Sequence, residues 1–142
     1  MKTECPTILK ELEKIKKEAI NSSGEKYYNV STDQVKNLAH KFKLPGREVE
    51  ILALQNNIIP ERYHRNLGAI SPSEQVKLLQ SKVAIIGAGG LGGTVLELLV
   101  RLGIGELIIA DKDIIGDSNL NRQILSTETN LGQSKTEVAV KR

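Results

Sequence analysis

The sequence predicts an α/β fold with a parallel sheet, incomplete at its C-terminal end and preceded by a small all-α module. Two observations predict the α/β part. The apolar run Val83–Ile86 leads directly into the glycine-rich segment Gly87–Gly92, and a second apolar run, Leu107–Ala110, ends in Asp111. A strand, a tight turn, a helix and a second strand in this order form one right-handed crossover unit of a parallel sheet.

Composition restricts the class of protein. With 39% hydrophobic and 26% charged residues, the chain has the balance of a globular protein. No apolar run approaches the length needed to cross a bilayer, and residues 1–13 lack the pattern of a secretory signal, so we expect no membrane contact and a cytoplasmic location. Lysine and glutamate are interspersed and aromatics amount to 3%, which argues against nucleic-acid binding. Cys5 is the single cysteine and excludes an internal disulfide.

Three amphipathic segments predict an all-α module over residues 1–60. The first helix ends at the turn residues Asn21–Gly24, and the second begins at Ser31, whose hydroxyl is placed to cap a helix that carries Gln34 three residues later. The third runs over residues 47–56. The apolar positions at helical spacing are Ile8, Leu12, Ile15 and Ala19 in the first helix, Val35, Leu38, Ala39 and Phe42 in the second, and Val49, Leu52 and Ala53 in the third.

Two short helices around a tight turn also resemble a DNA-binding helix-turn-helix. The third helix, however, carries Glu48 and Glu50 beside the single cation Arg47, which is a poor arrangement for a phosphate-lined groove. We therefore favour a docking or dimer-packing role for this module.

The second domain, residues 61–142, opens with a further helix. Ser71–Glu74 supplies a capping hydroxyl, a proline at the first helical position and an acid in the first turn. The strand Val83–Ile86 is apolar throughout, as expected for a strand buried on both faces. The next helix, Gly90–Leu102, is expected to face the sheet with Leu91, Val95, Leu98, Leu99 and Leu102.

The segment Gly87–Gly92 fits the pattern G-x-G-x-x-G of Rossmann-like nucleotide sites. Gly87 allows the tight turn, Gly89 leaves room for a phosphate, and Gly92 lets the helix approach the strand. Gly90 opens the helix, whose positive end favours an anion. Asp111 follows Gly92 by 19 residues, where an acid meets ribose hydroxyls.

Two cations in the following loops, Arg122 and Lys135, favour a triphosphate over a dinucleotide. A dinucleotide's two-phosphate bridge is largely served by the helix end. Transfer of a nucleotide from ATP builds charge on the α-phosphate and on the leaving pyrophosphate, and fixed cations stabilise that charge. The competing interpretation is a solvated charged loop.

At these positions the chain resembles the ThiF, MoeB and HesA adenylyltransferases, relatives of the enzymes that activate ubiquitin. The resemblance covers about residue 60 to the end. The matching pieces, in order, are Glu61–Asn66, Gly87–Gly92, Asp111–Asp113, Ser118–Gln123 and Gly132–Lys135.

The resemblance implies that ATP and Mg²⁺ adenylate the C-terminal glycine of a ubiquitin-like sulfur carrier, in thiamine, molybdopterin or related cofactor biosynthesis. By the same resemblance, the cofactor-binding residues are Gly87, Gly89, Gly90, Gly92, Asp111, Asp113, Asn119, Arg122 and Lys135, and the catalytic residues are Arg65, Arg122 and Lys135. Arg65 would reach into the neighbouring subunit's site, which implies a homodimer.

The resemblance also implies missing parts. The magnesium-binding aspartate and any zinc cysteines are expected beyond Arg142, so no metal ligand is predicted here. A two-stranded parallel sheet would leave both edges unpaired, so we expect this chain to be the front part of a longer enzyme. Two other functions remain open: an NAD-dependent oxidoreductase, and a noncatalytic nucleotide-binding adaptor.

Overall fold

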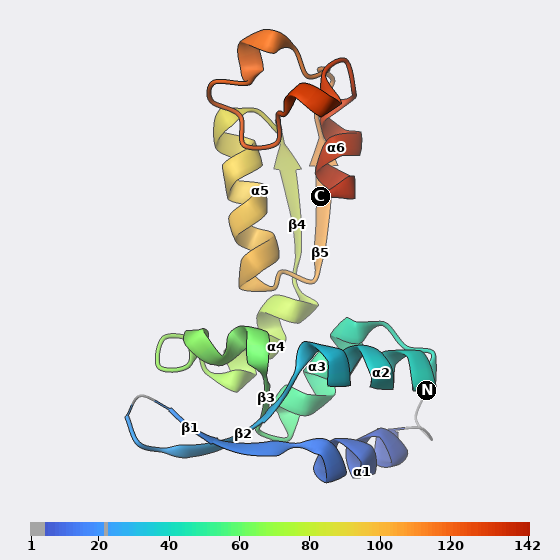
Figure 1. The fold of residues 1–142 in the computed structure, drawn as a ribbon, viewed down its shortest axis with the longest axis vertical. Coiled ribbons are helices and arrows are strands. Elements are labelled where there is room, and N and C mark those ends of the chain that lie inside the picture. The colour runs from blue at the N-terminus through green and yellow to red at the C-terminus, as the bar shows by residue number, and fades with distance from the viewer. Residues whose placement is uncertain (1–4, 22) are drawn as a thin grey trace. The chain divides into compact units, whose positions relative to one another are not determined.

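The computed structural model describes residues 5–21 and 23–142. The chain forms two compact units, Met1–Leu79 and Gln80–Arg142. Their elements are labelled in Figure 1, and each unit is described by itself below. The division falls after Leu79, so the helix that begins at Pro72 packs with the first unit.

The first unit combines helices with a three-stranded sheet. Its elements are α1 (Cys5–Ile15), β1 (Lys17–Ile20), β2 (Lys26–Val30), α2 (Thr32–Phe42), α3 (Gly46–Gln55), β3 (Ile58–Pro60), the 3-10 helix η1 (Glu61–Asn66) and α4 (Pro72–Gln80). Strand β2 pairs antiparallel with β1 and parallel with β3. The expectation of an all-α module over residues 1–60 is therefore wrong.

A β-hairpin replaces the predicted end of the first helix. Helix α1 ends at Ile15, and Ala19 lies in β1 opposite Tyr27. The side chain of Asn21 accepts hydrogen bonds from the backbone N–H groups of Ser23 and Glu25, at 3.0 and 2.9 Å. Asparagine side chains that bond their own backbone in this way form turns, so Asn21 closes a hairpin between β1 and β2 and does not end a helix.

The other predicted helices of this unit are confirmed. Ser31 caps α2 by accepting a hydrogen bond from the N–H of Gln34 at 3.2 Å, and the Gln34 side chain accepts one from the N–H of Ser31 at 2.7 Å. Gln34 also donates to the carbonyl of Ile15 at 2.8 Å, so the cap of α2 satisfies the end of α1 as well. The core that joins the three helices to the sheet consists of Ile8, Leu12, Val30, Val35, Leu38, Val49, Ala53 and Ile58.

A second apolar cluster packs η1 and α4 against the opposite side of α3. Its buried members are Ile51, Leu54, Ile59, Tyr63, Val76 and Leu79, with Tyr27 and Leu67 packed against them. Residues 61–79, which the sequence analysis places in the second domain, thus share a core with α3 and β3.

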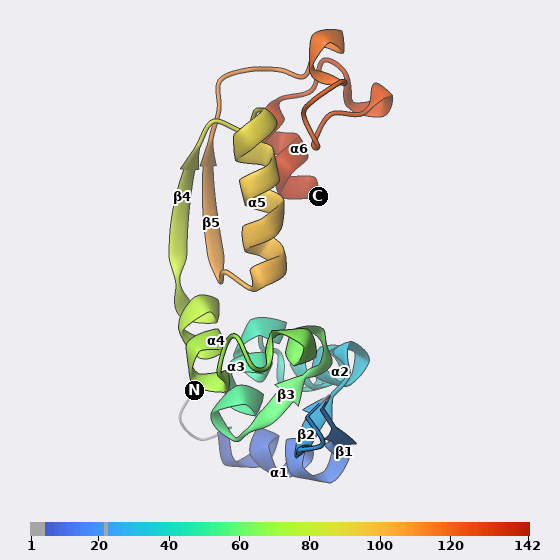
Figure 2. The same ribbon diagram turned by 90° about the vertical axis from the view of Figure 1, so that its left-hand side faces the viewer.

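The second unit contains β4 (Lys82–Ile86), α5 (Gly90–Leu102), β5 (Glu106–Ala110), two 3-10 turns (Asp117–Asn119 and Glu128–Asn130) and α6 (Lys135–Lys141). Strands β4 and β5 are parallel, with Val83 opposite Leu107, as predicted. Helices α5 and α6 lie on one side of this sheet (Figure 2). The core between them contains Ile85, Ala88, Leu96, Ile115, Leu125, Val138 and Ala139.

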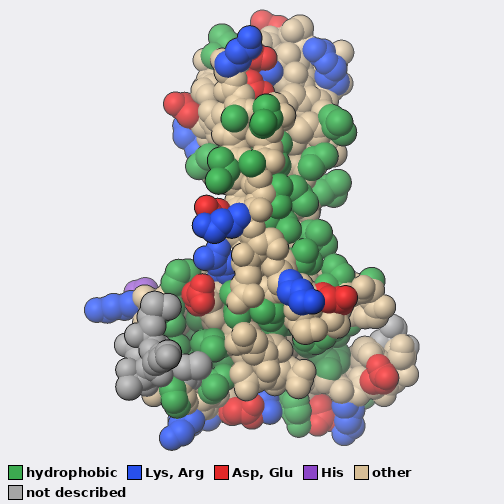
Figure 3. All heavy atoms as spheres, turned by 180° about the vertical axis from the view of Figure 1, so that it is seen from behind, with side chains coloured by type: hydrophobic (Ala, Val, Ile, Leu, Met, Phe, Trp, Pro, Cys, Tyr) green, Lys and Arg blue, Asp and Glu red, His purple; other side chains and the backbone are tan. Residues whose placement is uncertain are grey.

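The sequence predicts that strand β4 is buried on both faces, but in the structure one of its faces is exposed. Ile85 faces the helices and is 9% exposed, whereas Ile86 faces the opposite side and is 90% exposed. No helix of the described residues covers that side, and hydrophobic side chains lie open along it (Figure 3).

The predicted orientation of α5 is also partly wrong. Leu91, Val95 and Leu98 are exposed, and the leucine buried against the sheet is Leu96. Gly92 and Gly93 lie on the face of the helix that closely approaches the glycine turn and the Leu125 side chain. Leu96 and Leu99 follow on the same helical face.

Candidate functional site: the glycine turn and the loops after β5

The turn between β4 and α5 requires glycine at its ends. Gly87 has φ +90°, which side chains disfavour, and its N–H donates to the carbonyl of Ala110 at 2.7 Å. A Cβ at Gly92 would lie 1.8 Å from the carbonyl oxygen of Gly87. The first and last glycines of the motif therefore have the conformational roles that the sequence predicts.

The turn leads into the N-terminus of a 13-residue helix. Gly89 is the N-cap of α5 and supplies no side-chain cap. The first N–H groups of a helix lack intrahelical partners and carry a partial positive charge. An uncapped end at a glycine turn suits an anion such as a phosphate.

The loop after β5 packs against this turn. A Cβ at Gly90 would lie 3.3 Å from the carbonyl oxygen of Arg122, and one at Gly89 would lie 3.9 Å from Nε2 of Gln123. Gln123 is 8% exposed. Gln123 stands at the end of the motif Ser118–Gln123, but the sequence predicts no role for it, because a glutamine by itself does not indicate burial.

Asp111 fastens the glycine turn to the end of β5. Its Oδ2 accepts a hydrogen bond from the N–H of Ala88 at 2.6 Å, and its Oδ1 accepts one from the N–H of Asp113 at 2.8 Å. Burial alone would raise the pKa of Asp111, but these two N–H groups, with Lys135 and Lys112 nearby, hold it below the ordinary value. Asp111 is therefore an ionised anchor of the turn, and its predicted contact with ribose stays a prediction.

Asp113 and Lys135 form a pair beside this anchor. Nζ of Lys135 lies 3.1 Å from Oδ2 of Asp113, and the N–H of Lys135 donates to the carbonyl of Asp113 at 3.1 Å. The Lys135 side chain is 7% exposed. A lysine is almost never buried without a partner, so Asp113 holds the charge of Lys135 in place at the start of α6.

Asn119 and Arg122 lie in the loop between β5 and α6. Oδ1 of Asn119 accepts a hydrogen bond from the N–H of Gly116 at 3.1 Å. Nη1 of Arg122 donates to the carbonyl of Ser118 and to Oδ1 of Asn121. The Arg122 side chain is exposed, so it lies at the surface of the second unit with its planar group partly engaged by its own loop.

A shallow hollow of about 670 Å³ lies at the carboxyl ends of β4 and β5. Ligands of open parallel sheets bind at this edge. Its lining contains Gly87, Asp111 and Asp113 together with Lys112 and Thr136, which the sequence analysis does not single out. All the predicted site residues except Arg65 belong to the second unit, and three of them, Gly87, Asp111 and Asp113, line this hollow.

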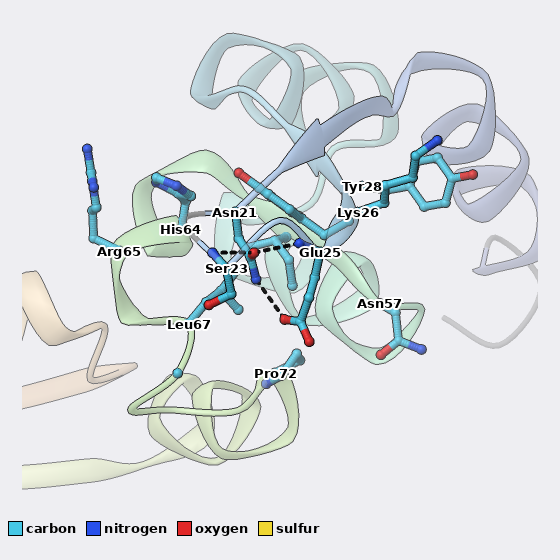
Figure 4. A pocket seen from close by; sticks show the side chains of 13 residues that line it. Asn21, Ser23, Glu25, Lys26, Tyr28, Asn57, His64, Arg65, Leu67 and Pro72 are labelled. Atoms are coloured by element: carbon cyan, nitrogen blue, oxygen red, sulfur yellow. Dashed lines mark hydrogen bonds between the residues drawn. The ribbon is translucent and has the colours of Figure 1, made fainter.

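Arg65 belongs to the first unit. It lies in η1, is exposed, and borders a separate pocket of about 550 Å³ in that unit. In Figure 4 its side chain extends away from the other labelled residues. His64, beside it, stacks on Tyr27 with ring centroids 5.9 Å apart and planes 13° apart.

The residues that the structure describes contain no group of three or more His, Cys, Asp or Glu side chains placed to hold a metal ion. No helix among them is both long and apolar enough to cross a membrane.

A parallel sheet, a glycine turn at a helix N-terminus and an acid after the second strand define a Rossmann-like α/β protein with a nucleotide-type site. Residues 63–142 match the ThiF family, which is more than half of the chain. The chain therefore belongs to the ThiF family.

Two curated relatives illustrate this family. A sulfur carrier protein adenylyltransferase of Thermus thermophilus is 42% identical over 84 residues, covering 58% of this chain and 31% of that protein. The SAMP-activating enzyme E1 of Haloferax volcanii is 38% identical over 81 residues, covering 56% of this chain and 30% of that protein. The chain thus spans about a third of the length of these relatives.

Solved structures agree with the fold. E. coli MccB crystallised with ATP is similar with a TM-score of 0.55 and 31% identity, over 79% of this chain and 35% of MccB. That share is larger than the part that matches the ThiF family, so the similarity to MccB covers more of the first unit than residues 63–79. MccB has also been crystallised with MccA.

Proposed function

We propose that this chain is the ATP-binding part of an adenylyltransferase that activates the C-terminal glycine of a ubiquitin-like sulfur carrier. The observation that supports it is the connected anchor Ala88–Asp111–Asp113–Lys135, which joins the glycine turn to a buried cation. The Thermus relative is named for this reaction.

In the proposed reaction, a carboxylate oxygen of the carrier's terminal glycine forms a bond to the α-phosphorus of ATP. The bond from that phosphorus to the bridging oxygen of pyrophosphate breaks, so an acyl-adenylate and pyrophosphate result. Carboxylates are weak nucleophiles, and holding the reactants in line contributes about 7–11 kcal/mol. The residues that we expect to do this are the glycine turn and Asp111 for the nucleotide, with Asn119, Arg122 and Lys135 for the phosphates.

Lys135 and Arg122 would contribute differently. The Lys135 charge is held by Asp113 inside the fold, so it is preorganised and needs no rearrangement as charge develops on the phosphates. Arg122 is exposed and bonded to its own loop, so it would turn toward the triphosphate when ATP binds.

The proposal includes a cytoplasmic homodimer in which Arg65 of one subunit contacts the phosphates bound by the other. Mixing two inactive variants tests this part. Dimers formed from Arg65→Ala and Lys135→Met subunits should regain activity, because each mixed dimer contains one site with both cations. If mixing restores nothing, Arg65 does not act across subunits.

The test of the function is ATP–pyrophosphate exchange by the protein with a purified sulfur carrier. Exchange should require the carrier and fall by at least about tenfold in Arg122→Ala, since a charge-assisted hydrogen bond to phosphate is lost. Lys141→Ala, which removes an exposed charge of the same unit, is the matched control.

Tight NAD binding without exchange would instead support an oxidoreductase, and partner binding unaffected by Asp111→Ala would support an adaptor.

The similarity to MccB supports a second candidate substrate, because it extends further into the first unit than the match to the ThiF family does. In that case the acyl group would belong to a counterpart of MccA and not to a sulfur carrier. The same exchange assay separates the two, with each substrate supplied alone.

A further inference from the structure

A buried carboxylate links helix α3 to the segment that carries Arg65. Glu50 lies on α3 and is 5% exposed. Carboxylates are almost never fully buried unless they are paired. Glu50 contacts two side chains, and both belong to η1.

The two contacts engage consecutive residues. Oε1 of Glu50 lies 3.3 Å from Nε of Arg62, and Oε2 accepts a hydrogen bond from the Tyr63 hydroxyl at 3.2 Å. Tyr63 is 4% exposed. Burial and the nearby Glu50 charge raise the pKa of Tyr63 to about 12, so the hydroxyl remains a donor at neutral pH.

The next residue along the chain is anchored too. His64 stacks on Tyr27 of β2. Arg62 and Tyr63 are therefore held by Glu50 and His64 by Tyr27, and Arg65 is the first residue after them to extend outward (Figure 4).

The packing of this unit alone does not require a carboxylate at position 50. A buried charge pays a desolvation cost, and apolar residues of similar volume often replace buried ion pairs without loss of stability. Glu50 instead determines the orientation of its neighbours, because the two oxygens of a carboxylate accept from two side chains at once and so fix both.

We infer that Glu50 is a positioning residue that holds the segment Arg62–His64 so that Arg65 projects in one direction. The inference rests on the proposed function, in which Arg65 contacts the phosphates of ATP. The first unit then holds a catalytic arginine in position, in addition to any docking role.

The experiment is a double-mutant cycle on the full protein, measured by ATP–pyrophosphate exchange. Glu50→Gln keeps the shape and one acceptor but loses the charge that holds Arg62. It should lower kcat by about tenfold with little change in the KM for the carrier, as for loss of one charged contact. In the Arg65→Ala background the same substitution should change kcat by less than about twofold, because its effect acts through Arg65.

Two further variants support the cycle. Tyr63→Phe removes only the hydroxyl and should give a smaller loss that also disappears in the Arg65→Ala background. Glu11→Gln removes an ion-paired carboxylate elsewhere in the same unit and should leave kcat unchanged in both backgrounds. An equal loss from Glu50→Gln in both backgrounds, or no loss at all, would overturn the inference.

Amide hydrogen exchange provides a readout that does not depend on catalysis. In Glu50→Gln, residues 61–66 should exchange faster while α1 and α2 stay unchanged. If the wild-type protein shows no pyrophosphate exchange, the proposed function fails, and the amide measurement still decides whether Glu50 fixes this segment. Unchanged protection of residues 61–66 would overturn the positioning role.

Discussion

Gly92 is the residue of the glycine turn that tolerates substitution least. A Cβ there would meet the Gly87 carbonyl oxygen at 1.8 Å, and backbone cannot move aside as a flexible side chain would. Gly92→Ala should destabilise the second unit by about 3 kcal/mol, the upper end for an overpacked site, and abolish nucleotide binding. Urea unfolding and a nucleotide titration measure the two effects.

The control for this prediction is Gly116→Ala. Gly116 has no heavy atom within 4 Å of the position of an added Cβ, so the change should stay within about 0.5 kcal/mol. If Gly92→Ala is equally mild, the close approach of α5 to the turn is not present in solution.

Asp111 gives the second unit a specific response to acid. Its pKa is lower in the folded chain than its ordinary value of 3.8, so its stabilising effect is complete above that pH. The effect is lost as the pH falls through the folded-state pKa. Asp111→Asn should remove this part of the acid sensitivity and weaken nucleotide affinity by at least about tenfold, since an amide cannot accept from both N–H groups.

The measurement is unfolding between pH 2 and pH 7, with Asp117→Asn as the control for removing an exposed carboxylate in the next loop. An acid response that Asp111→Asn leaves unaltered would contradict the role of Asp111 as the ionised anchor of the turn.

For single residues, the sequence predicts the position correctly where the spacing of a motif alone determines the structure. Gly87, Gly92 and Asp111 are placed as the motif predicts, because a tight turn followed by a helix leaves few geometries for the backbone. The spacing does not reveal that Asp111 binds Ala88, or that Gln123 is buried against the turn, because both depend on how a distant loop folds back.

At the scale of elements, Glu11 connects two helices across the surface of the first unit. Its carboxylate contacts Lys41 of α2 at 2.8 Å and Lys14 of α1 at 2.9 Å. The hydrogen bond with Lys41, followed by that with Lys14, lowers the pKa of Glu11 to about 2. Lys41→Met should therefore raise this pKa toward the ordinary value of 4.5.

An NMR titration of the Glu11 carboxyl group measures the change. The stabilising effect of this group is present above pH 4.5 and is lost as the pH falls toward 2. Lys36→Met, on the same helix, should leave the Glu11 titration unchanged. A Glu11 pKa that stays near 2 in Lys41→Met would show that the two helices are not joined in this way.

The elements that the sequence analysis missed are short and depend on distant partners. Ala19 continues the helical spacing of α1, yet it lies in β1, which has four residues and pairs with β2. Strand β2 in turn needs β3, about 30 residues further along, where Tyr28 pairs with Ile58. Local propensity does not encode such pairings, whereas helix α2 was predictable because Ser31 and Gln34 form its cap locally.

At the scale of the whole molecule, the predicted domain boundary and the compact units differ for a physical reason. The family match begins at residue 63, but Tyr63, Val76 and Leu79 pack with Ile51 and Leu54 of α3. Sequence similarity reports common ancestry, and packing reports which segments fold together. The segment that carries Arg65 thus resembles the nucleotide-binding family while being held by the first unit.

The second unit exposes an apolar sheet face, and this gives the last prediction. Ile86 is 90% exposed and Ile108 is 57% exposed on that face, while Ile85 on the other side is 9% exposed. Exposed apolar patches of this kind bind hydrophobic dyes and favour association. In the 142-residue chain, Ile86→Ser should reduce dye fluorescence and change unfolding stability by no more than about 0.5 kcal/mol. Ile85→Ala, the buried neighbour, should cost about 2–5 kcal/mol because it leaves a cavity under α5. A loss from Ile86→Ser as large as that from Ile85→Ala would mean that this face is covered in solution by packed apolar groups.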